Sequence, residues 1–429
     1  MRKSKLFIYA VLALTLILLT TILVWEPVTQ GRPPGFFVIG MAVLLIVNAA
    51  FCILSIAAID RGRQQLIAKL WLFAFSLVCF YLVLDVVGGF MFIQPTHYPY
   101  SPDEHVHHKM LPRTSYRMHD GYGDFDVEMT TSNMGFRGSD IKEKEPGTYR
   151  IVMLGDSFTL GEGVWDDWTF PHLVEQYLNE KKGRKYEVIN LGVDSYSPAL
   201  EYIELKEYIG MLKPNMVILN FDMSDVVNEY AYRKIASYDK TGDVIAVNGF
   251  PEYYRRWILK HLFITRHAVE NMKKHFGANE MTLRTAVEAP YEKLLNHTLD
   301  MPQLKEAAEM YSMVEDSIER AKKLCDRYGC KFILSVYPWG HQVSGQEWLP
   351  GRYRFIPKGV GISDRTVLEL ERFSKAQKIT FFNAFPYFRE YKGGQHLYFS
   401  HDMHWTPTGQ ELMAKSLTKF LEEYLNKGE

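Results

Sequence analysis

From Tyr149 onward the chain alternates short β-rich apolar runs with longer helical patterns, and this alternation constrains its fold most strongly. The strand-like runs are YRIVMLG, YEVINLG, NMVILNF, KFILSVYP and ITFFNAF. The helical patterns are TFPHLVEQYLNEKK, PALEYIELKEYIGML, MPQLKEAAEMYSMVEDSIERAKKL, SDRTVLELERFSKAQ and TPTGQELMAKSLTKFLEEYL. Strands buried on both faces are apolar along their whole length, so the pattern predicts a parallel sheet between helical layers. We therefore expect an α/β fold over residues 149–429, with three α/β/α layers around a five-stranded parallel sheet.

Two segments do not follow the alternation. Residues 228–300, between the third and fourth strands, are rich in Tyr, Arg, His and Lys and have the length of a lid or binding loop. Residues 95–148 are polar and lack a helical period, which indicates a stalk followed by irregular β structure that packs onto the next domain.

Three long apolar runs precede these segments: Leu6 to Val24, Phe36 to Ile59 and Leu70 to Ile93. Each is long enough to cross a hydrocarbon core about 30 Å thick, so residues 1–94 are predicted to be a membrane anchor of three transmembrane helices. A cleaved signal peptide is the rival reading of the first run, but that run is too long and lacks a small-residue cleavage site.

The loop charges predict the orientation of the anchor. Basic residues precede the first span and separate the second from the third, whereas the loop between the first two spans holds only Arg32. Positive loops stay in the cytoplasm. The N-terminus is therefore expected in the cytoplasm and everything after Gln94 on the periplasmic or extracellular side. Asp85 lies inside the third span, where it is expected to snorkel, to pair within the bundle or to contact a membrane partner.

Composition excludes several classes of protein. With 429 residues, a formal charge of −1 and 47% apolar residues, the chain is neither a disordered tail nor a basic nucleic-acid-binding domain.

Cys325 and Cys330 stand close together, and a disulfide between them is an open alternative. The histidines at 105, 107 and 108 fit a solvated stalk better than a metal site, because no ligand pattern accompanies them. We expect no metal, no cofactor and no nucleic-acid partner.

The chemically informative residues follow the predicted strands, because ligands of parallel α/β sheets bind beyond the carboxyl ends of the strands. Ser157 follows the first strand in GDSFTLGEG, where Gly155 permits a tight turn. Alone, this serine is equally well explained as a turn or capping residue. The segment HDMHWTPTGQ places Asp402 and His404 two residues apart, just before the last helix. An imidazole beside a carboxylate supplies the oriented base that a nucleophilic serine needs.

The blocks GDSFTLGEGV, NLGV and Asp-x-His-Trp resemble the SGNH (GDSL-type) hydrolase superfamily, from about Tyr149 to Leu425. They are most similar to its membrane-associated branch related to alginate-type polysaccharide O-acetyltransferases, and TSNMGFRG resembles a lead-in common in such proteins. The resemblance implies an SGNH-like domain and a catalytic triad: Ser157 as nucleophile, His404 as base and Asp402 as its orienting acid. It also implies that the N–H groups of Ser157 and Gly192 receive the oxyanion.

One block departs from that pattern. The family motif Gly-x-Asn-Asp is replaced by Asp222, Ser224 and Asp225, in NFDMSDVVNEY. Ser224 or Asn228 then has to supply the missing oxyanion donor, or the site has another acceptor geometry. Further residues are substrate-binding candidates: Asn228, His341, Trp405 and Arg137, the last of which could instead buttress the active-site loops.

Three functions follow as alternatives. The first is acyl transfer through an acyl-serine that O-acetylates an envelope or exopolysaccharide, for which the resemblance implies a separate membrane acyltransferase as acetyl donor. The second is an esterase or deacetylase that hydrolyses acyl esters on carbohydrate. The third is a carbohydrate-binding or scaffold protein with a weakened site.

Overall fold

The computed structural model describes residues 52–53, 63–92, 100–180, 183–250, 265 and 295–426. The chain divides into two compact units. One contains Met1–Ile93 with His261–Thr265, and the other contains Gln94–Lys260 with Arg266–Glu429.

The described part of the first unit is dominated by one apolar helix, α3 (Gln64–Phe92). This helix covers nearly all of the third predicted span. Its segment Gln65–Val87, of 23 residues, is long and apolar enough to cross a membrane, by length and composition. The other two predicted spans, Leu6–Val24 and Phe36–Ile59, lie outside the described residues apart from Cys52 and Ile53. The described residues thus contain one candidate span, and the other two spans remain a prediction.

Asp85 on α3 is buried, and its partner lies in the predicted insertion. Its carboxylate accepts hydrogen bonds from the Thr265 backbone N–H at 3.1 Å and from the Thr265 hydroxyl at 2.5 Å. Thr265 also bonds to the hydroxyl of Tyr81 at 2.6 Å. The Asp85 carboxyl group, which the sequence places inside the third span, is thus hydrogen-bonded to residue 265 of the same unit.

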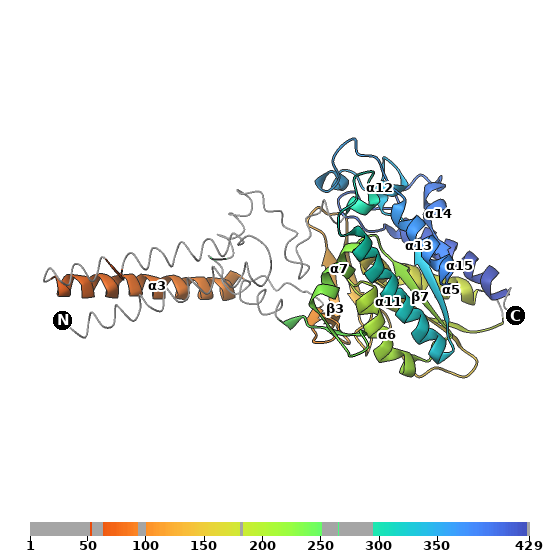
Figure 1. Cartoon of the computed structure of the whole chain (residues 1–429), viewed down its shortest axis with the longest axis horizontal. Helices are drawn as coiled ribbons and strands as arrows, with labels where there is room; N and C mark the ends of the chain where they lie inside the picture. Colours follow the sequence, from red (N-terminus) through yellow and green to blue (C-terminus); the bar gives the residue numbers. More distant parts are fainter. Residues whose placement is uncertain are drawn as a thin grey trace. The chain divides into compact units, whose positions relative to one another are not determined.

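The second unit contains the predicted five-stranded parallel sheet, in the order β11-β10-β7-β5-β6. Figure 1 labels its central strand, β7. The strands are β5 (Tyr149–Gly155), β6 (Tyr186–Gly192), β7 (Met216–Phe221), β10 (Lys331–Val336) and β11 (Thr380–Asn383). All residues of β5 and β7 are buried, as their unbroken apolar sequences predict for the centre of a sheet. The predicted α/β class and the five-stranded sheet are confirmed.

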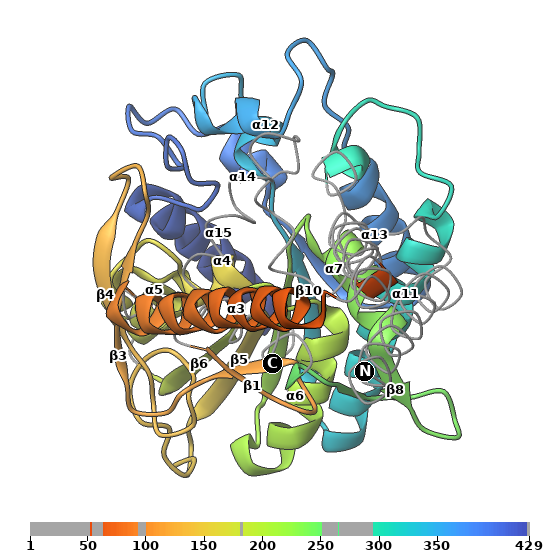
Figure 2. The same cartoon turned by 90° about the vertical axis from the view of Figure 1, so that its left-hand side faces the viewer.

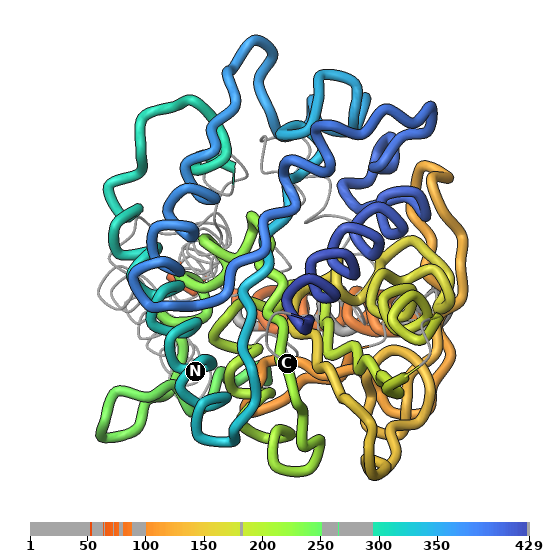
Figure 3. The backbone as a smooth tube through the Cα atoms, turned by 90° about the vertical axis from the view of Figure 1, so that its right-hand side faces the viewer, coloured from red at the N-terminus to blue at the C-terminus, as the bar shows by residue number. Residues whose placement is uncertain are grey.

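Helices cover both faces of this sheet (Figure 2). On one face α11 packs against α6 and α7, with α13 beside them, and on the other face α15 packs against α5. Figure 3 shows the same pairing, with dark-blue α15 beside the yellow-green segment that contains α5. The long helices are α5 (Phe170–Asn179), α6 (Pro198–Leu212), α7 (Asp225–Ile235), α11 (Ala307–Tyr328), α13 (Arg365–Ala376) and α15 (Pro407–Asn426).

Short helices lie in the loops between these elements: α4 (Ser157–Leu160), η1 (Asp166–Trp168), η3 (Asn296–Thr298), α12 (Gly340–Val343), η4 (Gly351–Arg354) and α14 (Phe385–Arg389). Local sequence sets several helix ends. Pro198 begins α6, where its missing N–H costs nothing, and Gly329 ends α11 in the left-handed conformation with φ 70°.

Residues 100–148, expected to be stalk and irregular lead-in, form two antiparallel hairpins within the unit that contains the sheet. Their strands are β1 (Tyr100–Pro102), β2 (His108–Met110), β3 (Ser115–His119) and β4 (Asp126–Thr130). The expectation of a solvated histidine cluster is wrong for His107, which is buried, and His108 bonds to the Asp194 carbonyl at 2.7 Å. The ring of Tyr232 packs against the buried His107, and the ring of Tyr196 packs against the half-buried His108.

The described start of the predicted insertion consists of α7 and a hairpin, β8 (Ala236–Tyr238) and β9 (Val244–Val247). Val247 forms a bridge with Val106, which joins this hairpin to the lead-in. Most of 251–294 lies outside the described residues. Cys325 and Cys330, the possible disulfide, are both free and buried, and the Cys330 thiol donates to the Cys325 carbonyl at 3.5 Å.

Candidate active site

The carboxyl ends of three neighbouring strands meet at one edge of the sheet. Gly155, the last residue of β5, is in register with Gly192 of β6 and with Asn220 of β7. Ser157, the turn after β6 and the Asp222–Asp225 loop therefore lie beside one another, as expected for a site at the carboxyl ends of parallel strands.

A strained turn presents Ser157. Gly155 has φ 154°, and a Cβ there would meet the Thr159 hydroxyl oxygen at 2.1 Å, so this position requires glycine. Asp156 caps the next helix, because its carboxylate accepts the Phe158 N–H at 2.9 Å. Ser157 is then the first residue of α4, where its own N–H has no helical acceptor and can point at a ligand.

The chain just before α15 forms a tight loop that presents His404 and Asp402. Trp405 pairs with Tyr398 across the base of the loop, and the Phe399 N–H donates to the His404 carbonyl at 3.0 Å. At the tip, the Asp124 carboxylate from the β3–β4 loop accepts the N–H groups of His401 at 2.6 Å and of Asp402 at 2.9 Å. A residue of the lead-in thus holds the backbone that carries the acid.

Ser157, His404 and Asp402 form one hydrogen-bonded chain. The His404 Nε2 lies 2.7 Å from the Ser157 Oγ, and its Nδ1 lies 2.5 Å from the Asp402 Oδ1. The Asp402 carboxylate also accepts the His404 backbone N–H at 2.9 Å, which fixes both groups. Such an arrangement can deprotonate a serine hydroxyl and carry the proton to a leaving group.

Several carboxylates surround the imidazole. Burial lowers the pKa of His404, but the charges of Asp402, Glu162 and Asp156 outweigh it and raise that pKa to about 10. Asp156 is itself buried, and burial with repulsion from Asp222 raises its pKa well above the ordinary value. The Tyr337 hydroxyl donates to Asp156 at 3.0 Å. The site therefore favours a positively charged imidazole, the form reached once the serine proton has moved.

Comparison with known families agrees with this geometry. A model of the family described as GDSL-like lipase/acylhydrolase matches residues 151–417, which is more than half of the chain. The chain belongs to the GDSL-like lipase/acylhydrolase family. This GDSL-like protein is accordingly an enzyme of the esterase or acyl-transferase type, and its α/β domain has the SGNH-like fold.

Solved structures similar to this GDSL-like protein include other esterases and acylhydrolases. The lipase/acylhydrolase from Enterococcus faecalis is 13% identical, covers 64% of this chain and 96% of its own, and has a TM-score of 0.36. A catalytic mutant of Axe2, an acetylxylan esterase from Geobacillus stearothermophilus, is 12% identical, covers 63% and 93%, and has a TM-score of 0.33. A search of curated proteins finds no significant match.

The predicted oxyanion donors are arranged differently from the GDSL-like pattern. The Gly192 N–H donates to the Asn190 side chain at 2.8 Å, so it is not available as an oxyanion donor in this structure. Gly192 has another reason to be glycine, since a Cβ there would meet the Leu160 nitrogen at 2.3 Å. Three residues on, Ser195 has φ 61°, and its N–H donates to no acceptor among the described residues.

Hydrogen bonds to the Asp222 carboxylate hold the Asp222–Asp225 loop in place. The buried Asp222 carboxylate accepts the Ser224 N–H at 2.7 Å and the Trp339 indole N–H at 2.6 Å. Asn228 donates to the Ser224 Oγ at 3.3 Å, so these two oxyanion candidates lie together at the start of α7. Asp222 thus stands where the family has glycine and anchors the loop to the segment after β10.

Three predicted substrate-binding residues are structural instead. His341 is 1% exposed and bonds to the Thr298 hydroxyl at 2.9 Å, and burial lowers its pKa to about 3. Trp405 is fully buried among aromatic rings, including that of Phe158. The buried Arg137 donates to the carbonyls of Leu160, Gly161 and Val164, and so buttresses the loop after α4. Their positions in the chain cannot reveal that their side chains point inward.

Among the described residues, Glu162, Asp402 and His404 form the one group of acidic and histidine side chains whose possible metal-ligating atoms all lie within 4.8 Å. Both imidazole nitrogens already have hydrogen-bond partners, in Asp402 and in the Ser157 hydroxyl. We therefore assign Asp402 and His404 to the hydrogen-bonded chain of Ser157, with Glu162 as a neighbouring carboxylate.

Sequence reasoning missed four residues around the triad: Asp124, Asp156, Glu162 and Tyr337. Asp156 and Glu162 lie in the serine block itself, and the glycines on both sides of Glu162 were an available signal. Asp124 and Tyr337 belong to distant segments, so only the folded chain brings them to the site.

Proposed function

We propose that this GDSL-like protein transfers acyl groups through a covalent acyl-serine on Ser157. His404 takes the hydroxyl proton as Oγ attacks the ester carbonyl carbon, and the carbonyl electron pair moves to oxygen. The tetrahedral intermediate then collapses, and Nε2 returns the proton to the leaving oxygen. The observation that carries the proposal is the chain Ser157–His404–Asp402, with separations of 2.7 and 2.5 Å.

The oxyanion of this proposal is received by the N–H of Ser157 and by a second donor. Ser224, Asn228 and the Ser195 N–H are candidates for that second role. Ser224 and Asn228 lie together after β7, and Ser195 follows β6 in the left-handed conformation that places an N–H outside the strand.

The proposed acyl acceptor is a hydroxyl of an envelope or exopolysaccharide, with acetyl as the acyl group. The motif resemblance to alginate-type O-acetyltransferases supports this acceptor, and so does α3, which we propose to be part of a membrane anchor over residues 1–94. The proposed topology has the N-terminus in the cytoplasm and the catalytic domain outside. Acetyl groups would then arrive from a separate membrane acyltransferase. The alternative acceptor is water, which makes the protein a carbohydrate esterase.

A fluorophosphonate probe tests the acyl-serine directly. Because the probe reacts only with an activated serine, the full-length wild-type protein in detergent should be labelled at Ser157. Ser157→Ala should abolish labelling, and Ser139→Ala, which removes an exposed hydroxyl outside the site, should leave it intact. An unlabelled wild type, or equal labelling of Ser157→Ala, would refute the mechanism and favour a carbohydrate-binding protein with a weakened site.

The acceptor is tested with p-nitrophenyl acetate, with and without oligosaccharide. Transfer predicts acetylated sugar, detected by mass spectrometry, and a faster release of p-nitrophenol when the sugar is present. Release of acetate alone, at a rate that the oligosaccharide does not change, would identify the protein as an esterase.

A further inference from the structure

Glu162, directly after the nucleophile helix, lies between two glycines that both need their left-handed backbone. Gly161 and Gly163 each have φ 86°. A Cβ at Gly161 would meet the Thr169 methyl carbon at 2.5 Å, and a Cβ at Gly163 would meet the Phe399 ring at 2.5 Å. Neither position can accept another residue without rearrangement of its neighbours, so the chain follows one path past Glu162.

The backbone of Glu162 is tied to the nucleophile. Its N–H donates to the carbonyl of Ser157 at 3.0 Å, beside the Gly161 N–H at 2.9 Å. The Arg137 guanidinium holds the far side of the same loop through the carbonyls of Gly161 at 2.6 Å and Val164 at 2.5 Å. These four hydrogen bonds fix the backbone of Glu162 relative to Ser157.

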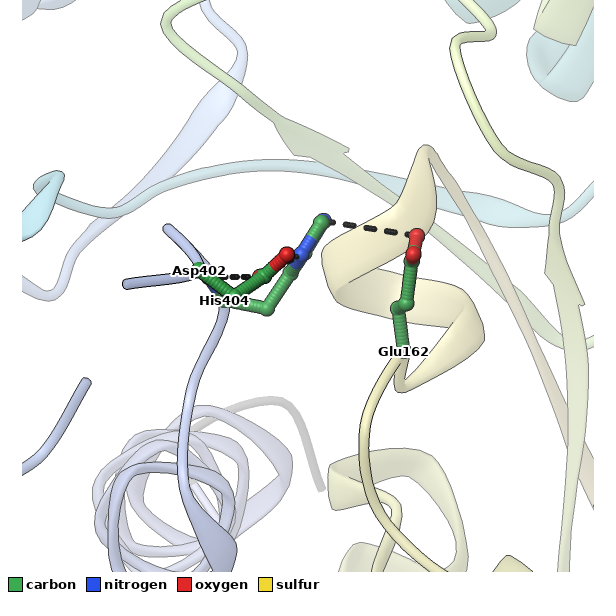
Figure 4. A group of neighbouring side chains, drawn as sticks. All are labelled: Glu162, Asp402 and His404. Atoms are coloured by element: carbon green, nitrogen blue, oxygen red, sulfur yellow. Dashed lines mark hydrogen bonds and ion pairs between the residues drawn. The ribbon is translucent and has the colours of Figure 1, made fainter. Parts of the chain in front are cut away.

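The Glu162 side chain reaches the imidazole of His404 (Figure 4). Its Oε2 lies 3.6 Å from the His404 Nε2, whereas Asp402 bonds to the other nitrogen. The Ser157 Oγ lies 2.7 Å from that same Nε2. A separation of 3.6 Å exceeds a good hydrogen bond but is well within the reach of a charge interaction. The Glu162 side chain is 23% exposed, so it is partly accessible to solvent.

We propose that Glu162 is a second acid of the site, which stabilises the His404 imidazolium from its Nε2 side during acyl transfer. This inference rests on the proposed function of Ser157. In each half-reaction an O–H bond breaks, an Nε2–H bond forms, and the proton later passes to the leaving oxygen. Glu162 gains and loses no proton. Glu162 acts on the reaction only through the charge on His404, so it is a positioning residue.

Among the described residues, four carboxyl groups interact with the charge of His404, each from a different segment: Asp402 from its own loop, Glu162 from the loop after α4, Asp156 from the end of β5 and Asp222 from the end of β7. Burial raises the pKa of both Asp156 and Asp222, which reduces their negative charge. Among the described residues, Asp402 and Glu162 are the two acids whose carboxylate oxygens lie within 4.0 Å of an imidazole nitrogen of His404, at 2.5 and 3.6 Å. Removing either should make the imidazolium harder to form.

The test compares Glu162→Gln with wild type in full-length protein, through the pH dependence of kcat/KM for p-nitrophenyl acetate. The change keeps the length of the side chain and removes its charge. Because an opposite charge at this distance raises a pKa by about one to three units, the acid limb should move down by about one pH unit or more. A less basic imidazole should also lower the high-pH plateau, roughly threefold to thirtyfold. Glu162→Asp, which retains the charge, should keep the limb near its wild-type position.

Glu371→Gln is the matched control, because it removes the same charge from an exposed position on α13. Glu371→Gln should leave both the acid limb and the high-pH plateau of kcat/KM unchanged. A Glu162→Gln enzyme that loses activity while its acid limb stays in place would overturn the proposal, since that pattern indicates a purely structural role.

A second measurement separates this proposal from the proposed function. The pKa of His404 is followed by NMR of protein with isotope-labelled histidine, with His404→Gln to assign the signal. A lower pKa in Glu162→Gln supports the pairing even in a protein without acyl-transfer activity. An unchanged pKa refutes the pairing even in an active one.

Discussion

The Asp402 carboxylate accepts two hydrogen bonds from His404, one from the backbone N–H and one from Nδ1–H, so the imidazole has a single orientation and tautomer. Asp402→Asn keeps the shape but offers an amide that favours the wrong tautomer. We expect kcat for p-nitrophenyl acetate to fall by about 10⁴, with unchanged thermal unfolding. A loss of less than about tenfold would show that Asp402 is not the orienting acid.

At the residue scale, the sequence could predict which side chains follow the strands but not where they point. Ser157, Asp402 and His404 lie together because each follows or adjoins a recognisable element end. His341 also follows a strand, yet its side chain turns inward and bonds to Thr298. Gly192 was expected to offer its N–H, and a neighbouring asparagine side chain takes that N–H instead. Such competition for a hydrogen bond depends on three-dimensional contacts.

At the scale of elements, the regular part of the fold was predictable and the irregular part was not. The five strands coincide with the five apolar runs because a buried parallel strand has no exposed face to be polar. The lead-in hairpins gave no such signal: alternate residues of β4 are exposed, and both hairpins are short. Their contribution to the site, through Asp124, therefore appears only in the structure.

Asp124 provides the test at this scale. It holds the His401–Asp402 backbone from the β3–β4 loop, so Asp124→Ala should loosen the loop that carries the acid and the base. We expect kcat to fall about 10- to 100-fold, and the free energy of unfolding to fall by about 1–3 kcal/mol. Asp126→Ala, on an exposed position of β4, is the control. Equal kinetics for the two variants would show that the lead-in does not support the site.

At the scale of the whole molecule, the most unusual feature is a group of buried acids under the site. Asp156, Asp222, Asp225, Glu201 and Glu229 are all almost fully buried, and burial raises the pKa of each. Both carboxyl oxygens of Glu201 lack a hydrogen-bond partner within the described residues. Mutual repulsion adds to burial, so these groups hold protons at pH values where exposed acids have lost them.

The group makes stability depend on pH with a definite sign. An acid whose pKa is raised in the folded state stabilises the fold below its unfolded pKa, near 4, and this contribution is lost as pH rises through the folded pKa. Glu201→Gln removes one such group without changing its size. It should therefore stabilise the protein more at pH 8 than at pH 5, by about 1–3 kcal/mol, as measured by denaturant unfolding at both pH values. Equal effects at the two pH values would mean that Glu201 is ionised throughout.

The buried acids also change the net charge of the native protein. The formal charge of −1 counts every carboxyl group as ionised. Because burial raises the pKa of Glu201, Glu204 and Asp225 well above the ordinary value, the native molecule keeps protons that its composition counts as lost and is less negative than that composition implies. Unfolding releases those protons. The native protein should therefore focus at a higher isoelectric point than the same chain in urea, and its folding should take up protons from a neutral buffer.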